Sequence, residues 1–126
     1  MKLSDSEWKV MTALWESSPA SVRDVLERIG PDTRWAYSTV KTILERLVRK
    51  KALRVRKRAN SGIFEPLITR SAARRAALRS LIERAFDGAF GPLVQHLFVE
   101  EKLSSQERRQ LASMLEDLDR EREKGA

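Results

Sequence analysis

The first half of the chain carries apolar residues at the spacing of amphipathic helices in three successive segments. The first segment begins near Ser4, where Ser4-x-x-Glu7 fits a capping box. The second begins near Ser21, and the third spans about residues 36–50. In the third segment the apolar residues recur at i, i+3, i+4 and i+7, namely Val40, Ile43, Leu44 and Leu47. Turn-forming residues at 17–19 and 30–32 separate the segments. The pattern therefore predicts three helices, with a break at each of these two positions.

An alternating pattern replaces the helical one after residue 52. Apolar and basic residues alternate over residues 53–56, as expected of a strand with one buried face. Residues 60–62 are a turn signal, and residues 63–67 have the pattern of a return strand. Pro66 is expected at an edge or end of that strand, where no ladder N–H is needed. Three helices followed by a hairpin predict a winged helix-turn-helix domain over residues 1–68.

The second half of the chain, residues 69–126, is predicted to be helical throughout. Thr69 or Ser71 can cap its first helix, Gly88 is expected to end or bend that helix, and Ser104 begins a capping box. Three amphipathic helices in so short a segment carry more apolar surface than they can bury on one another, so a second copy of the chain is the simple partner. We predict a mainly α fold with a small β-hairpin wing and a C-terminal helical dimerisation domain. The candidate dimer-interface residues are Phe90, Leu93, Val94, Leu97, Phe98, Leu111, Met114, Leu115 and Leu118.

Positive charge is concentrated in the first half. Residues 1–67 contain 14 basic and 8 acidic residues, whereas residues 68–126 contain 11 basic and 10 acidic residues, which together give the net charge of +7. The 13 residues from Arg46 to Arg58 contain eight cations and no acid. Such a run is often only a solvated surface. Here it covers the end of the third helix and the hairpin, which are the elements that meet DNA in a winged helix, so the sequence favours binding to phosphate backbones.

The polar face of the third helix supplies candidates for reading bases. Lys and Arg reach guanine O6 and N7, and Thr offers a hydroxyl or a methyl group, which selects Thr39, Lys41, Thr42 and Arg46. Ser38 and Tyr37 lie where the helix begins and can contact phosphate instead, although Tyr37 can also pack and Ser38 can be a plain helix residue. The phosphate-contact candidates are Tyr37, Ser38, Arg49, Lys50, Lys51, Arg54, Arg56, Lys57 and Arg58.

The remaining chemistry excludes several classes of protein. The chain has no cysteine and a single histidine, His96, so we expect no disulfide, metal site, cofactor or catalytic group. Trp8 and Trp15 share an apolar stripe and are expected in the core, although tryptophans can also stack on single-stranded bases. No apolar run is long enough to cross a bilayer and the first ten residues lack a signal core. We therefore expect a cytoplasmic protein without direct membrane insertion.

Two longer motifs resemble those of a known family. They are Glu7-Trp8-x-x-Met11-x-x-Leu14-Trp15 and Trp35-Ala36-Tyr37-Ser38-Thr39-Val40-Lys41-Thr42-x-Leu44-x-Arg46-Leu47. Together with Lys50-Lys51-Ala52-Leu53 and Phe64-x-Pro66-Leu67, they resemble the penicillinase repressors of the BlaI/MecI type. The resemblance is specific in the first domain and extends over the whole chain in length and helix order. It implies a winged-helix dimer that binds a palindromic operator in double-stranded DNA and dimerises through its C-terminal helices.

The resemblance also implies a mode of regulation. Members of that family repress genes for a β-lactamase or penicillin-binding protein and for a membrane metalloprotease sensor. They are inactivated when the sensor or its effector leads to cleavage of an Asn-Phe bond in the C-terminal domain. The matching position here is about His96–Leu97, so this sequence departs from the pattern. The absence of cysteine also excludes the copper-sensing branch.

Two other functions are compatible with the same residues. A sequence-neutral structural DNA-binding protein would bind operator and random DNA alike. A winged-helix module that binds protein would not bind DNA, and the uninterrupted cation run argues against it. An enzyme has the least support because no nucleophile, base and oxyanion set can be assembled.

Overall fold

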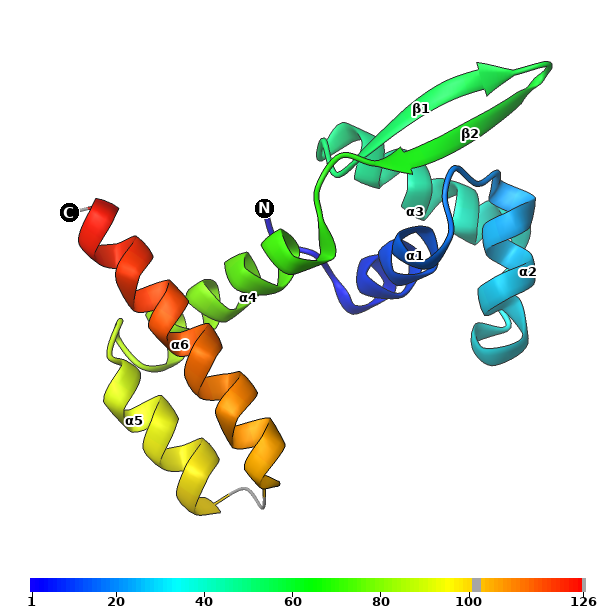
Figure 1. Ribbon diagram of the computed structural model, residues 1–126. Coiled ribbons are helices and arrows are strands. Elements are labelled where there is room, and N and C mark those ends of the chain that lie inside the picture. Colours follow the sequence, from blue (N-terminus) through cyan, green and yellow to red (C-terminus); the bar gives the residue numbers. More distant parts are fainter. Residues whose placement is uncertain (101–102, 126) are drawn as a thin grey trace. The chain divides into compact units, whose positions relative to one another are not determined.

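Three helices and a two-stranded antiparallel hairpin build the first of two units in the computed structural model, which describes residues 1–100 and 103–125. The first unit is Met1–Arg74 and the second is Arg75–Ala126. The elements, drawn in Figure 1, are α1 (Asp5–Glu16), α2 (Val22–Thr33), α3 (Tyr37–Arg49), β1 (Leu53–Arg58), β2 (Ser61–Pro66), α4 (Arg70–Ala85), α5 (Phe90–Gln95), a π-helical turn (His96–Glu100) and α6 (Ser105–Gly125). The predicted mainly α fold with a hairpin wing is confirmed.

Capping boxes start the first two helices. The Ser4 hydroxyl accepts the Glu7 backbone N–H at 3.3 Å, while the Glu7 carboxylate accepts the Ser4 backbone N–H at 2.8 Å. Ser21 and Asp24 make the same pair of bonds at the start of α2, at 3.1 and 2.9 Å. Each box satisfies donors that the first helical turn leaves without a partner, which contributes about 1 kcal/mol to each helix.

The core of the first unit lies where α1, α2 and α3 pack against one another and against the base of the hairpin. The four apolar residues predicted for the inner face of α3 are all at most 4% exposed, and Met11, Leu14 and Val25 face them. Burying each large apolar side chain contributes about 1.5–3 kcal/mol. This packing fixes the rotation of α3 about its axis, and so determines which of its side chains face solvent.

The predicted break at residues 30–32 is wrong, because α2 continues through Pro31 to Thr33. Proline is tolerated there because the helix is already ending. Pro31 lacks the N–H that would reach the Glu27 carbonyl one turn earlier. The last turn is closed by other donors, since the Thr33 hydroxyl donates to the Ile29 carbonyl at 2.9 Å and the Arg34 N–H to the Gly30 carbonyl at 2.8 Å. Arg34 then turns the chain out of the helix with a φ of 58°.

The hairpin is buried only at its base. Leu53 and Phe64 are buried, and Phe64 exchanges two backbone hydrogen bonds with Ala20 at 2.8 and 3.1 Å. Val55 lies directly opposite Phe64 but is 45% exposed. On β1 the expected buried face therefore ends at Leu53, whereas on β2 burial reaches Phe64. Beyond it, the ribbon of β1 and β2 extends away from the helices (Figure 1). Pro66 ends β2, as predicted.

Helices α5 and α6 and most of α4 form the second unit around a small core. Ile82, Leu93 and Leu115 are buried there. Gly88, with a φ of 79°, follows the end of α4 and donates its N–H to the Ile82 carbonyl at 3.1 Å. The predicted capping box at Ser104 is present at the start of α6. Within the described residues, no helix combines the length and apolar character needed to cross a membrane.

Candidate nucleic-acid interface

The solvent-facing side of α3 is a polar ridge. Ser38, Thr42, Glu45 and Arg49 follow one another along it at helical spacing, opposite the buried residues, and all four are exposed. Tyr37, Lys41 and Thr39 are exposed on its two sides. The sequence places nine candidates on α3 or just after it. Six of them are thus brought together on one surface, namely Tyr37, Ser38, Thr39, Lys41, Thr42 and Arg49.

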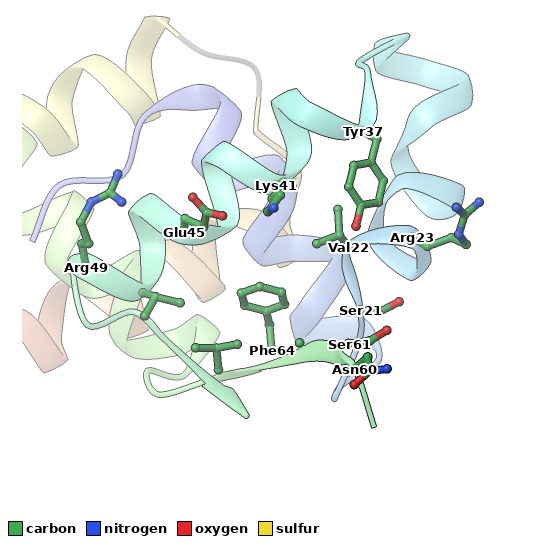
Figure 2. Close-up of a pocket in the computed structure, with 13 residues that line it drawn as sticks. Ser21, Val22, Arg23, Tyr37, Lys41, Glu45, Arg49, Asn60, Ser61 and Phe64 are labelled. Atoms are coloured by element: carbon green, nitrogen blue, oxygen red, sulfur yellow. The ribbon is translucent and has the colours of Figure 1, made fainter. Parts of the chain in front are cut away.

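A groove of about 820 Å³ separates this ridge from the hairpin. Figure 2 shows Tyr37, Lys41, Glu45 and Arg49 of α3 along one wall and Phe64 of β2 pointing toward that helix. The start of α2 and the hairpin turn complete the lining with Ser21, Arg23, Asn60 and Ser61. Arg23, Lys41 and Arg49 face a single acid, Glu45, in this lining, so the groove is suited to a negatively charged ligand. Sequence reasoning missed Arg23, because the groove exists only once α2, α3 and the hairpin are assembled.

The other side of the ridge borders a second, more open groove of about 430 Å³. It is lined by Ser6, Trp35, Ser38, Thr39, Thr42, Ile43 and Arg46. Helix α3 therefore stands between two hollows. A helix exposed in this way fits the B-DNA major groove, which is about 12 Å wide and about 8.5 Å deep.

Glu7 is fully buried and binds two of the predicted DNA contacts, of which Arg46 lines the second groove. Its carboxylate accepts hydrogen bonds from Arg46 Nε at 3.1 Å and Lys50 Nζ at 2.7 Å. Burial alone would raise the pKa of Glu7, but the bonds from Lys50, the Ser4 backbone and Arg46 outweigh it and lower the pKa to about 2. Lys50 Nζ also donates to the Lys2 carbonyl at 2.8 Å.

The capping-box motif identifies Glu7 as a capping residue, but its second role was missed. Its ion-pair partners lie 39 and 43 residues further along the chain. Nothing in the local pattern around Glu7 indicates them.

A second carboxylate occupies the hairpin. Glu65 lies directly opposite Arg54 in the strand register, with 3.2 Å between Arg54 Nη2 and the Glu65 carboxylate, and it also pairs with Arg56. Partial burial opposes ionisation of Glu65, but the bond from Arg54 and the charge of Arg56 hold its pKa below its usual range. Glu65 thus balances charge on the outward face of the wing.

These two carboxylates change the interpretation of the cation run. Counted along the sequence, the eight cations from Arg46 to Arg58 have no acid among them, yet Glu7 and Glu65 pair with four: Arg46, Lys50, Arg54 and Arg56. The other four are Arg49, Lys51, Lys57 and Arg58, all exposed and without an acidic partner among residues 1–100 and 103–125. The unbalanced positive charge therefore lies on the α3 ridge, just after it, and at the hairpin tip.

The chain is similar to known proteins over nearly its whole length. The penicillinase repressor family model matches residues 3–117. The penicillinase repressor of Bacillus licheniformis is 27% identical over 116 residues, covering 92% of this chain and 91% of that one. The methicillin resistance regulatory protein MecI of Staphylococcus aureus strain N315 is 26% identical over 114 residues, covering 90% and 93%.

Two solved structures resemble the first unit. One is the solution structure of the DNA-binding domain of the repressor BlaI, 30% identical with a TM-score of 0.51, covering 56% of this chain and 85% of that one. The other is monomeric Bacillus licheniformis BlaI in complex with the blaP half-operator, 30% identical with a TM-score of 0.50, covering 56% and 87%. With a winged-helix fold and a family match over nearly its whole length, the chain belongs to the penicillinase repressor family of DNA-binding transcriptional repressors.

Proposed function

We propose that the chain represses transcription as a homodimer on a palindromic operator, with α3 of each copy in a major groove. The observation that carries this proposal is the exposed polar ridge of α3, which stands between two grooves and has unpaired cations at its end. The ridge offers Thr42 at its centre, Lys41 on the hairpin side, and Thr39 and Arg46 on the α1 side. These four residues are the proposed base readers.

The groove beside the hairpin is the proposed path of one phosphate backbone. Arg23, Lys41 and Arg49 line it, together with the hydroxyls of Ser21, Tyr37 and Ser61. Hydroxyl and guanidinium donors are the groups that most often contact phosphate oxygens. Lys57 and Arg58 at the hairpin tip extend this positive surface, so the wing and the start of α2 would hold the register in which α3 meets the bases.

The second unit is the proposed dimerisation domain, residues 69–126 in the sequence prediction. Leu93 and Leu115 are buried within one copy, while Val94, Leu97 and Leu111 are partly buried against them. Met114 remains 39% exposed, and Leu81 and Val99 are exposed too. The predicted interface residues Phe90, Phe98 and Leu118 have side chains outside the described part. Among the described side chains of this unit, only Ile82, Leu93 and Leu115 are buried, which is a small core for an independent domain, so a second copy that covers Leu81 and Met114 would complete it.

The proposed regulation follows from the family. Its relatives are named for penicillinase and methicillin resistance, so genes of β-lactam resistance are the proposed targets. Cleavage near His96–Leu97, with a membrane metalloprotease sensor or its effector as partner, would remove α6 from the dimer. His96 is exposed, and there the chain passes from α5 into a π-helical turn. A π turn is a rare local distortion of the helix.

Selection of binding sites from a random duplex DNA library, followed by footprinting with the full chain, tests the proposal. We expect one two-fold symmetric sequence with half-sites about one helical turn, or a small multiple of it, apart. Strong binding without an enriched sequence would favour the sequence-neutral alternative. No DNA retained at low salt would favour the protein-binding module.

A further inference from the structure

Arg46 approaches the DNA-facing surface while one of its nitrogens is already bound. Its side chain is 40% exposed and lines the groove beside Thr39 and Thr42, yet its Nε donates to the buried Glu7 carboxylate at 3.1 Å. In the described part of the chain, Nη1 and Nη2 of Arg46 have no hydrogen-bond partner. We propose that Glu7 is a positioning residue for sequence readout, which orients the Arg46 guanidinium toward base edges. This inference rests on the proposed function.

The geometry allows Arg46 to bind Glu7 and a DNA base at the same time. A guanidinium carries five N–H donors in a rigid plane, so binding Glu7 through Nε leaves the two terminal amino groups for an acceptor pair such as guanine O6 and N7. A long exposed side chain would otherwise lose rotamer freedom when it binds. Glu7 has removed part of that freedom before DNA arrives, because the carboxylate is itself fixed by the Ser4 backbone and by Lys50.

Glu7 has opposite effects on affinity and on specificity. Its charge offsets one of the two cations that it binds, and its lowered pKa keeps it ionised at neutral pH. Without that charge, the end of α3 would attract any phosphate backbone more strongly. Without the bond, Arg46 would no longer be directed at a base. A change in charge alone alters the affinity for all DNA sequences alike, whereas a change in the orientation of Arg46 alters the ratio of operator affinity to random-DNA affinity. Measuring this ratio therefore distinguishes the two effects.

Glu65 provides a matched control within the same domain. It also binds two arginines, Arg54 and Arg56, but these lie on the hairpin rather than on α3. Loss of its charge should strengthen binding to every DNA sequence and leave the ratio nearly unchanged.

The experiment compares Glu7→Gln with Glu65→Gln in the full chain. Glutamine at position 7 can still form the capping box through its amide oxygen, but its amide NH2 cannot accept from Arg46 Nε, so the substitution removes both the charge and the bond to Arg46. Dissociation constants are measured by fluorescence anisotropy on the selected operator and on random duplex of equal length, after circular dichroism confirms folding. We expect Glu7→Gln to lower the ratio of operator affinity to random-DNA affinity about tenfold, which is within the range of the effect of one base contact. Glu65→Gln should change the ratio less than about twofold, because wing cations contact phosphates alike in every sequence.

A double-mutant cycle with Arg46→Ala tests whether Glu7 acts through Arg46. Arg46→Ala alone should lower the ratio, and adding Glu7→Gln to it should lower the ratio no further. An unchanged ratio in folded Glu7→Gln would overturn the inference, as would a second fall in the Arg46→Ala background. A wild-type chain with no preference for any sequence would instead contradict the proposed function.

Arg46→Lys supplies the test if Glu7→Gln does not fold. The single ammonium group of lysine can bind Glu7 or reach a base, but it cannot offer a planar fork to both. We expect Arg46→Lys to lower the ratio of operator affinity to random-DNA affinity at least about fivefold, which is the low end of the effect of one base contact. A ratio equal to that of the wild type would overturn it.

Discussion

The indole N–H of Trp15 donates to the Ile68 carbonyl oxygen at 2.9 Å, across 53 residues of sequence. This bond attaches the segment that follows the hairpin to the end of α1. The Arg70 guanidinium lies over the same indole ring, 5.8 Å from its centroid, and the Thr69 hydroxyl caps the first turn of α4. The first turn of α4 is therefore attached to the winged-helix unit, and Trp15 has a structural role there rather than a surface for stacking bases.

Trp15→Phe should lower the free energy of unfolding of the first unit by about 1–2 kcal/mol. The change removes one hydrogen bond, leaves the Ile68 carbonyl with one partner fewer and weakens the contact with Arg70. Urea unfolding followed by circular dichroism measures the effect. Trp8→Phe is the control, because the Trp8 indole N–H has no hydrogen-bond partner among the described residues. Equal losses in the two variants would show that the Ile68 bond contributes nothing.

Much of the first unit follows from short-range pattern. The helical spacing on α3 and the capping box at Ser4 depend on residues within a few positions of one another, and both were predicted correctly. The predicted break at Pro31 is wrong. A sequence pattern does not show whether a proline lies in the interior of a helix or in its last turn, where other donors such as the Thr33 hydroxyl bind the final carbonyls.

The features that could not be predicted from the sequence depend on contacts between residues far apart in the chain. Glu7 meets Arg46 and Lys50 only after α1 packs on α3, and Val55 is exposed because the hairpin extends beyond the core. The charge count along the chain was right, but half of the cations in the basic run are paired with acids that lie outside it. The candidate residues could thus be named in advance, while their division into paired and unpaired cations required the fold.

Acid should remove the contribution of Glu7 to stability. Its pKa in the folded chain is about 2, against a reference value of 4.5. Because the folded pKa is the lower one, the stabilisation is complete above about pH 4.5 and is lost as the pH falls toward 2. Its size is on the order of 3 kcal/mol. The difference in unfolding free energy between the wild type and Glu7→Gln should therefore shrink between pH 5 and about pH 3. A constant difference over that interval would assign the loss to packing instead of charge.

Met114→Glu should weaken self-association without unfolding the protomer. Met114 is 39% exposed on α6, so a charge there costs a single chain little, whereas burial at an interface would leave it without water. Sedimentation equilibrium should show dissociation at least about tenfold easier than for the wild type, since desolvating an unpaired charge costs more than about 1.4 kcal/mol. Gln110→Glu, at an exposed polar position of the same helix, is the control. Unchanged association of the Met114 variant would place the interface elsewhere.

Arg58→Ala should reduce the salt dependence of DNA binding more than Arg54→Ala does. Both arginines are exposed and lie on the same face of β1, but Arg54 is paired with Glu65 while Arg58 has no acidic partner in the described part of the chain. An arginine neutralised by a neighbour gains less from a phosphate and displaces fewer condensed counterions from DNA. The slope of log K against log salt should fall by about 0.9 for Arg58→Ala and by less for Arg54→Ala. Adding Glu65→Gln to the wild type should steepen that slope, because it frees Arg54 and Arg56 together. Equal slopes for the two alanine variants would mean that the Glu65 ion pairs open when DNA binds, and that all the wing cations then contribute alike.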